Sequence, residues 1–190
     1  MPCEAGFYCE AGSSSYTGIA QEGKYAPLGS DRQYNCPRGT YNLDPQKASC
    51  LSCEAGRYCG VAGITEPIDC PAGFYCPSYD SQRSQGLYYD KIKCPAGTYN
   101  PITGRKSVAD CLPCTTGSYC ALPGLIAPTG TCTAGYYCNS KAIEPSPQVE
   151  DANKNYGPCP AGYYCEGGDK KVACEAGTFS SKLFKTFHSL

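Results

Sequence analysis

Cysteine is the residue type in this sequence most able to do chemistry, and two pairs have the spacing of a metal or redox motif. Cys50-Leu51-Ser52-Cys53 and Cys111-Leu112-Pro113-Cys114 are both C-x-x-C, a spacing shared by zinc half-sites and thiol-disulfide oxidoreductases. His188 is the only histidine, which argues against a Cys-His pair or a Ser-His-Asp triad. The other thirteen of the 17 cysteines mostly follow a different spacing. We therefore expect structural disulfides, with no metal, no cofactor and no catalytic residue.

A seven-residue pattern, C-x-x-G-x-aromatic-C, contains most of the remaining cysteines. Its copies span residues 3–9, 53–59, 70–76, 114–120, 132–138 and 159–165. A second form ends in a polar residue instead of cysteine and spans 36–42, 94–100 and 174–180. In C-P-A-G the proline favours the second position of a type I turn and the glycine its fourth. Nine turns of one design in one short chain indicate a repeat protein rather than a globular domain with one site.

The elements that position these cysteines are predicted to be short. Glycine and proline interrupt every apolar run, and no window has sustained helical periodicity. We expect strands of two to four residues at Gly39–Asn42, Arg57–Cys59, Phe74–Cys76, Gly97–Asn100, Tyr136–Cys138 and Tyr163–Cys165. The motif aromatics are expected to be more buried than the loop tyrosines Tyr16, Tyr25 and Tyr79. They are Tyr8, Tyr41, Tyr58, Tyr75, Tyr99, Tyr119, Tyr137, Tyr164 and Phe179.

The composition favours covalent stabilisation over a hydrophobic core. The chain has 190 residues, with Gly 22, Pro 16 and Cys 17, and Leu, Ile, Val and Phe together make up only about 13% of it. A formal net charge of −1 argues against the charge-driven disorder that such a composition otherwise suggests. The predicted fold class is small disulfide-rich repeats in an elongated irregular rod, with short β-strands, little or no helix and no large hydrophobic core.

The motifs resemble a known family. CPAGTYN followed by C-L-x-C looks like the ephrin-receptor-like cysteine-rich repeat, related to growth-factor-receptor and tumour-necrosis-factor-receptor modules. Arrays with CPAGYYC variants are similar to large surface proteins of protists and algae. The resemblance covers most of residues 3–180 and implies an extended, disulfide-stapled rod, but it does not by itself imply a ligand.

Two disulfide pairings use the cysteines economically, and the sequence leaves both open. The local scheme pairs Cys3–Cys9, Cys36–Cys50, Cys53–Cys59, Cys70–Cys76, Cys94–Cys111, Cys114–Cys120, Cys132–Cys138 and Cys159–Cys165, which leaves Cys174 over. The ladder scheme pairs Cys9–Cys36, Cys50–Cys59, Cys53–Cys70, Cys76–Cys94, Cys111–Cys120, Cys114–Cys132, Cys138–Cys159 and Cys165–Cys174, which leaves Cys3 over. The forward closure Cys36–Cys50 is the one that the receptor modules imply. We favour the local scheme, and we count all seventeen as structural disulfide cysteines.

The motif order predicts a super-repeat of about 60 residues. Equivalent cysteines recur at offsets of 58 (Cys36 and Cys94), 61 (Cys50 and Cys111) and 62 (Cys70 and Cys132). The predicted divisions are a partial module and loop at 1–35, super-repeat 1 at 36–93 and super-repeat 2 at 94–173. Super-repeat 2 has an extra module at 159–173, and 174–190 is a truncated third unit with an atypical tail.

Disulfides on this scale imply an oxidising compartment, so we expect a secreted or cell-surface protein. The sequence shows neither a signal peptide nor a membrane-spanning stretch, and we expect it to be a fragment of a longer secreted chain or to begin at a late start site. The near-neutral charge argues against nucleic acid, and without an N-x-S/T sequon any glycan would be O-linked. The predicted role is a structural or adhesive rod or filament that associates with more of the same repeat. The alternative is a ligand-binding module of a receptor-like ectodomain.

Overall fold

The computed structural model describes residues 1–84, 90–148, 156–166, 168, 171–176 and 178. Phe179 and His188 therefore lie outside the described residues. By their internal contacts the described residues form two units. The residues of the first lie within Met1–Pro71, Tyr75–Ile92 and Thr103–Ser107, and those of the second lie within Ala72–Phe74, Lys93–Ile102 and Val108–Leu190. The domain divisions predicted from the super-repeat remain a prediction.

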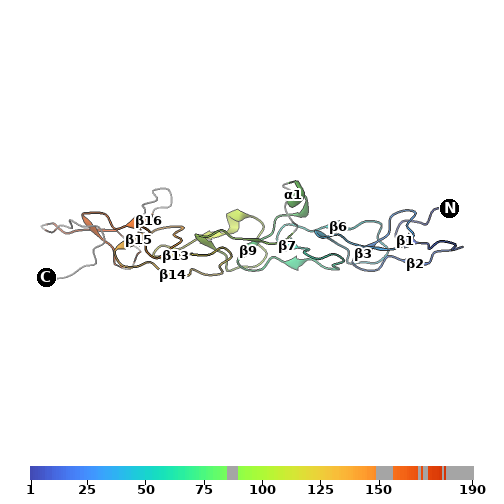
Figure 1. The fold of residues 1–190 in the computed structure, drawn as a ribbon, viewed down its shortest axis with the longest axis horizontal. Helices are drawn as coiled ribbons and strands as arrows, with labels where there is room; N and C mark the ends of the chain where they lie inside the picture. Colours follow the sequence, from blue (N-terminus) through green and yellow to red (C-terminus); the bar gives the residue numbers. More distant parts are fainter. Residues whose placement is uncertain (85–89, 149–155, 167, 169–170, 177, 179–190) are drawn as a thin grey trace. The chain divides into compact units, whose positions relative to one another are not determined.

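The regular structure is a series of two-stranded antiparallel hairpins (Figure 1). The pairs are β1 (Phe7–Tyr8) with β2 (Gly18–Ile19), β3 (Lys24–Tyr25) with β4 (Tyr34–Asn35), β5 (Thr40–Tyr41) with β6 (Leu51–Ser52), β7 (Arg57–Tyr58) with β8 (Ile68–Asp69), β9 (Phe74–Tyr75) with β10 (Ile92–Lys93), β11 (Thr98–Tyr99) with β12 (Leu112–Pro113), β13 (Ser118–Tyr119) with β14 (Gly130–Thr131), β15 (Tyr136–Cys138) with β16 (Tyr156–Pro158), and β17 (Tyr163–Tyr164) with β18 (Val172–Ala173). The first strand of each pair holds motif positions 5 and 6, and the six predicted strands are among them. The helical elements of the described chain are α1 (Tyr79–Ser84) and the 3-10 turn η1 (Val108–Asp110). The prediction of small disulfide-rich repeats with little helix is therefore confirmed.

The turn before each first strand differs by one residue from the prediction. The amide of Thr40 at position 5 donates to the carbonyl of Pro37 at position 2, at 3.0 Å, so the turn spans positions 2 to 5 and not 1 to 4. Glycine then stands third in the turn, where Gly39 has φ 87°. A positive φ at the third residue is the requirement of a type II turn, so the type I prediction was wrong.

A tenth motif lies in the predicted loop that follows the first motif. Residues 20–26 are Ala-Gln-Glu-Gly-Lys-Tyr-Ala, with glycine and tyrosine in place but alanine at both cysteine positions. Gly23 has φ 71°, and the amide of Lys24 donates to the carbonyl of Gln21 at 3.0 Å, which is the motif turn. We number the motifs 1 (3–9), 2 (20–26), 3 (36–42), 4 (53–59), 5 (70–76), 6 (94–100), 7 (114–120), 8 (132–138), 9 (159–165) and 10 (174–180).

The sixteen bonded cysteines follow the local pairing. Six disulfides close within a motif, and Cys36–Cys50 and Cys94–Cys111 close forward from the two polar-ended motifs. Cys174 has a free thiol, so counting it among the disulfide cysteines is corrected. A polar-ended motif needs a cysteine 14 or 17 residues after its first, and the sequence has no cysteine after Cys174.

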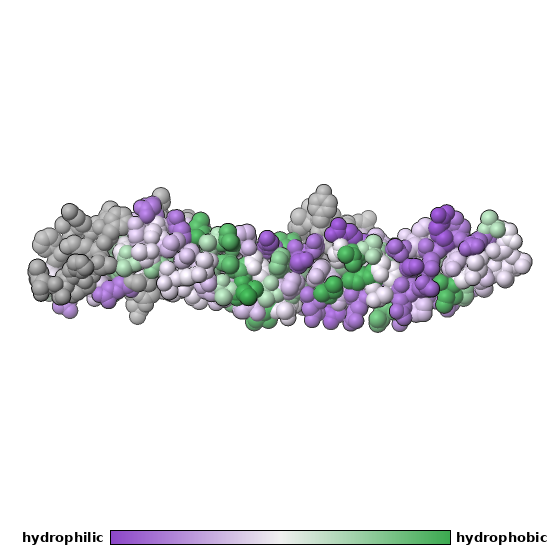
Figure 2. All heavy atoms as spheres, turned by 60° about the horizontal axis from the view of Figure 1, so that its bottom comes forward, coloured by the Kyte–Doolittle hydropathy of each residue, from purple (hydrophilic) through white to green (hydrophobic). Residues whose placement is uncertain are grey.

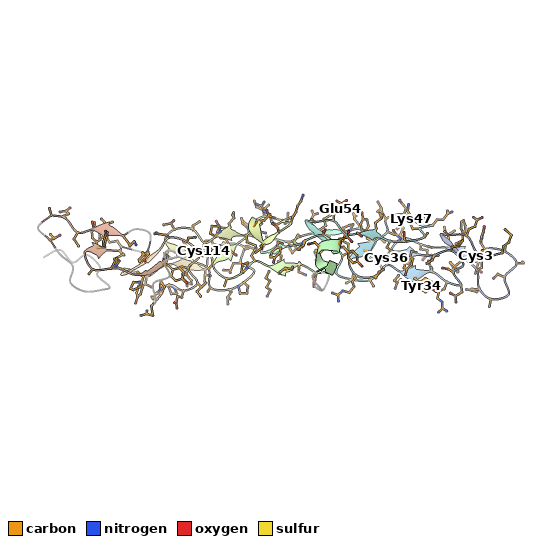
Figure 3. The ribbon with its side chains drawn as sticks, turned by 90° about the horizontal axis from the view of Figure 1, so that it is seen from above. Cys3, Tyr34, Cys36, Lys47, Glu54 and Cys114 are labelled. Atoms are coloured by element: carbon orange, nitrogen blue, oxygen red, sulfur yellow. A yellow bond between two sulfur atoms is a disulfide. The ribbon has the colours of Figure 1, made fainter. Side chains whose placement is uncertain are left out.

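Sulfur and small side chains make up most of the buried interior. The buried residues are mainly half-cystines, together with Ala20, Ala26, Asn42 and Asn100, each 0% exposed. Figure 3 shows Cys36 between the strands of the ribbon, with Tyr34 and Lys47 along its edges. Disulfides and buried alanine therefore occupy the interior that aliphatic side chains occupy in a globular domain.

The expected difference between motif and loop aromatics holds only in part. Tyr137 is buried and Tyr16 is exposed, as predicted. Tyr25 is half-buried like most motif aromatics, because it is position 6 of motif 2 and not a loop residue. Tyr79 is also half-buried, at the start of α1, so the prediction was wrong for these two.

Candidate functional site

The two C-x-x-C pairs are parts of separate disulfides. Cys50 is bonded to Cys36 and Cys53 to Cys59, and Cys111 and Cys114 are bonded to Cys94 and Cys120. None of these sulfurs is a thiolate while it is oxidised, so neither pair can ligate zinc or act as the attacking nucleophile in disulfide exchange. Across the described residues, no group of three or more His, Cys, Asp or Glu side chains is placed to hold a metal ion.

Recurring backbone geometry is found instead at the junction between successive motifs. At the junction of motifs 4 and 5, the amide of Gly56 donates to the carbonyl of Cys76 at 2.8 Å, and the amide of Cys70 donates to the carbonyl of Gly56 at 2.9 Å. Positions 1 and 7 of the later motif thus form a two-point clamp on the glycine of the earlier motif. We call this arrangement the glycine clamp.

The glycine clamp is repeated along the chain with almost constant dimensions. Both of its bonds are present at Gly6, Gly23, Gly39, Gly56, Gly73, Gly97, Gly117 and Gly135, with N to O distances of 2.7–2.9 Å. These are short, regular hydrogen bonds. They satisfy both backbone polar groups of a residue that is buried in the turn. The hydrogen-bonded junction between motifs is therefore repeated along the chain as regularly as the motif itself.

A second contact favours glycine at position 4 in five of the motifs. A Cβ placed on Gly56 would lie 2.7 Å from the carbonyl oxygen of Gly104, in the loop that follows motif 6. The same relation, with a loop two motifs further on, holds for Gly6 with Gln46, Gly23 with Gly63, Gly73 with Gly124 and Gly97 with Lys141. All five loop residues have positive φ. Each of these glycines is thus enclosed by the next motif and by the loop of the one after.

Asparagine replaces the second cysteine at position 7 of motifs 3 and 6 and makes hydrogen bonds in its place. Asn100 is fully buried. Its amide nitrogen donates to the carbonyl of Phe74 in motif 5 at 2.9 Å, and its side-chain oxygen accepts from the amide of Ile102 at 3.0 Å. Asn42 likewise donates to the carbonyl of Lys24 in motif 2 at 2.9 Å. The asparagine side chain therefore hydrogen-bonds its motif to the preceding one. The first cysteine of the same motif forms a disulfide with a cysteine in the segment that follows.

Substitution of this asparagine tests its role. We expect Asn100→Ala to lower the free energy of unfolding by about 2–4 kcal/mol, because it leaves buried backbone groups unpaired and opens a cavity. Asn35→Ala, at an exposed asparagine in β4, is the control and is expected to change it by less than about 0.5 kcal/mol. Urea titration of both variants measures the difference, and equal stabilities would show that the buried amide is dispensable.

Motif 2 has the junction geometry without the covalent bond. Its clamp on Gly6 is complete, with Gly6 to Ala26 at 2.8 Å and Ala20 to Gly6 at 2.9 Å. Ala20 and Ala26 are each 0% exposed and six residues apart, as the cysteines are in the stapled motifs. The hydrogen bonds of the junction therefore form without a disulfide inside the motif.

Adding the missing disulfide to motif 2 is expected to stabilise the protein. The double variant Ala20→Cys/Ala26→Cys is expected to form a ninth disulfide and to raise the free energy of unfolding by about 2 kcal/mol, from the closure entropy of so short a loop. Each single variant, which adds only a thiol, serves as the control. Thermal unfolding under oxidising conditions and a thiol count decide the question. A double variant that keeps both thiols would mean that motif 2 differs in backbone from its stapled neighbours.

The charged groups lie at the surface in isolated pairs. Asp31 and Arg32 are 2.7 Å apart and exposed, and the hydrogen bond from Arg32 lowers the pKa of Asp31 to about 2. Arg57 and Asp69 pair across the β7–β8 hairpin at 3.2 Å. Exposed pairs of this kind contribute little to stability. Figure 2 shows apolar patches separated by polar residues on the face drawn, and an open hollow of about 410 Å³ is lined by Gln21, Glu22, Pro45 and Thr65.

The comparisons with known proteins point to modules of larger proteins. No protein-family model matches the chain. The rat "Sushi, von Willebrand factor type A, EGF and pentraxin domain-containing protein 1" is 28% identical over 114 residues, 57% of this chain and 3% of that protein. The mouse "Signal peptide, CUB and EGF-like domain-containing protein 2" is 33% identical over 95 residues, 47% of this chain and 9% of that protein. "ABC transporter G family member 28" of Arabidopsis thaliana is 34% identical over 108 residues, 52% of this chain and 9% of that protein.

The chain spans less than a tenth of the length of these relatives. Two of them have EGF-like modules in their names, and with the eight disulfides they support a cysteine-rich module of the extracellular type. In the described part of the chain, no helix is long and apolar enough for a membrane span.

Proposed function

We propose that this chain is a structural or adhesive extracellular spacer, an extended array of stapled motifs that associates with further repeats of its own kind and has no catalytic activity. The observation that carries the proposal is the glycine clamp. The clamp joins each motif to the next one along the chain, and the additional loop contacts reach two motifs further. Contacts of such short range in motif order are typical of quasi-one-dimensional repeat proteins.

The chemistry of the described residues supports the same proposal. Sixteen cysteines are oxidised, which fits secretion or the cell surface. The mouse relative has "signal peptide" in its name, which fits the same location. The resemblance of the motifs to ephrin-receptor-like repeats belongs to this proposal and implies a spacer built of similar modules.

Small-angle scattering of the oxidised monomer tests the proposal. A compact domain of 190 residues has a radius of gyration of about 16 Å, and an unfolded chain of that length about 47 Å. We expect a value above the compact limit and below the unfolded one, with a constant cross-section along the particle. The fully reduced and denatured chain is the control for the unfolded limit. A radius near the compact value would reject the spacer and favour a ligand-binding ectodomain module.

A further inference from the structure

The hairpin of motif 2 carries a tyrosine on each of its two strands. Tyr25, at motif position 6, lies opposite Tyr34 in the antiparallel register of β3 and β4. The two ring centroids are 5.8 Å apart and the ring planes are tilted by 39°, a contact typical of cross-strand aromatic pairs. Tyr34 is 40% exposed and Tyr25 is half-buried, so small molecules in solution can reach the Tyr34 ring.

Among the hairpins with a described register, this tyrosine pair occurs only in the motif that lacks both cysteines. In the seven others the residue opposite position 6 is glycine or an aliphatic residue, such as Gly18 opposite Tyr8 or Leu51 opposite Tyr41. Motif 2 has alanine at both cysteine positions, so it has no covalent closure of its own. The strands of this one hairpin face each other with two phenols.

Hydrogen bonds on both sides of the pair hold the two strands in place. At the open end of the hairpin, the amide of Gly23 donates to the carbonyl of Asn42 at 2.8 Å, and the amide of Cys36 donates to the carbonyl of Gly23 at 2.8 Å. The hydroxyl of Tyr34 donates to the carboxylate of Asp31 at 3.2 Å. Two reacting groups that are already held together combine faster than groups that must meet by diffusion.

We propose that Tyr25 and Tyr34 are an oxidative cross-linking site, at which a one-electron oxidant joins the two rings as dityrosine. A haem peroxidase with hydrogen peroxide is an oxidant of this class. The oxidant removes one electron and one proton from each phenol hydroxyl. The two radicals then form a carbon–carbon bond between ring carbons ortho to the hydroxyls, and the hydrogen on each of these carbons moves to its phenol oxygen, which restores both aromatic rings. The reaction consumes one hydrogen peroxide, which is reduced to two water molecules.

The cross-link gives motif 2 a covalent closure that thiols cannot reopen. It restricts the unfolded chain over a short loop, as a disulfide does in the other motifs. The proposal requires an extracellular oxidant, but it does not depend on whether the chain acts as a spacer.

A second ring pair provides a negative control within the same molecule. Phe7 and Tyr16 are stacked with their centroids 4.3 Å apart, closer than the two tyrosines of motif 2. Phenylalanine has no hydroxyl hydrogen to lose, so this pair cannot form dityrosine. Close approach of two rings is therefore not enough, and the second phenol at position 34 makes the site.

Peptide mapping after oxidation tests the site. The disulfide-bonded full-length chain is treated in dilute solution with a haem peroxidase and hydrogen peroxide, then reduced, alkylated and digested with trypsin. Trypsin cleaves between the two tyrosines, which fall in separate peptides, residues 25–32 and 33–38, with no other tyrosine in either. We expect these two peptides to be joined in the main dityrosine product, with a mass two hydrogen atoms below their sum. The treated chain should still run as a monomer on electrophoresis.

Two variants show whether the second phenol is required. Tyr34→Phe keeps the ring but removes the hydroxyl, and it should abolish the joined peptide. Tyr163→Phe is the matched control, because Tyr163 is 41% exposed and lies in another hairpin, and it should leave the yield unchanged. Equal melting temperatures before treatment verify that both variants fold. After treatment, the unmodified chain should melt at a higher temperature than before, and Tyr34→Phe should not.

The same oxidation of a chain that is first reduced and unfolded in urea measures the contribution of the fold, and it does not depend on any variant. Unfolding should remove the preference for the joined peptide, since the strands no longer hold the rings together. An equal yield from the folded and the unfolded chain overturns the proposal. So does a folded chain in which the oxidant forms no dityrosine, joins other peptides in preference, or links only separate chains.

Discussion

Reduction of the eight disulfides is expected to unfold the whole described chain at room temperature. In the chain-entropy model each six-residue closure contributes about 2 kcal/mol and the two longer closures about 3 kcal/mol each. The total, on the order of 20 kcal/mol, exceeds the net stability of a typical domain, about 5–15 kcal/mol. The buried interior offers little to offset this loss, because it consists mainly of the half-cystines themselves.

Amide hydrogen exchange before and after reduction gives the sharpest measurement. The amides of the clamped glycines, Gly56 and Gly97 among them, are expected to lose essentially all protection once the thiols are free and alkylated. Reduced and re-oxidised protein is the control for damage during handling. Retained protection of these amides in the alkylated chain would mean that the backbone junctions, and not the cross-links, stabilise the fold.

A methyl group on a motif glycine is expected to be the most damaging single substitution. Gly56→Ala places a Cβ 2.7 Å from the carbonyl oxygen of Gly104, at a residue with φ 90°. The left-handed backbone costs about 1–2 kcal/mol for alanine, and displacement of a backbone carbonyl from a closed junction adds to it. We expect the free energy of unfolding to fall by about 3 kcal/mol or more.

Gly104→Ala is the matched control, since it alters the other side of the same contact. Gly104 has φ 75°, but a Cβ there meets no atom within 4 Å, so only the conformational cost of about 1–2 kcal/mol is expected. Urea unfolding of the two variants separates the steric from the conformational part. Equal losses for Gly56→Ala and Gly104→Ala would mean that the close approach of the Gly104 carbonyl is unimportant.

The local structure could be predicted because residues within one motif determine it. Glycine at position 4 and an aromatic at position 6 fix a turn followed by a strand, and all six strands expected from this pattern are present, for example Thr98–Tyr99 within Gly97–Asn100. The local disulfide pairing has the same origin, because the strand after the turn brings position 7 back beside position 1. Cα atoms of Cys53 and Cys59 are thereby 6.1 Å apart, within the range of a disulfide.

Motif 2 was missed because cysteine was used to find the motifs. Gly23 and Tyr25 carried a usable signal, since glycine two residues before an aromatic is common to every copy. Alanine can replace a half-cystine there because it is small and apolar, and the clamp needs only the backbone. The predicted turn began one residue too early for a similar reason. The prediction followed the preference of proline for the second residue of a type I turn, although glycine, which readily adopts positive φ, suits the third residue of a type II turn.

The junctions could not be predicted, because their partners are distant and are backbone atoms. No residue type marks the carbonyl of Gln46 as the neighbour of Gly6. Gln46 and Lys141 have φ 60° and 54°, a conformation usually reserved for glycine, so the loop geometry at these two places has no sequence signal. The role of Asn100 at position 7 was visible only as a polar exception to the pattern.

The placement of the disulfides has a mechanical consequence. Each covalent loop closes within a motif or in the segment directly after it, and none connects one motif to another. A pulling force would therefore load the glycine clamps, which can open and re-form, while the cross-linked loops limit how far each motif can be stretched. Such a chain is expected to lengthen in small, recoverable steps and to retain the turn geometry needed to close every junction again when the load is removed.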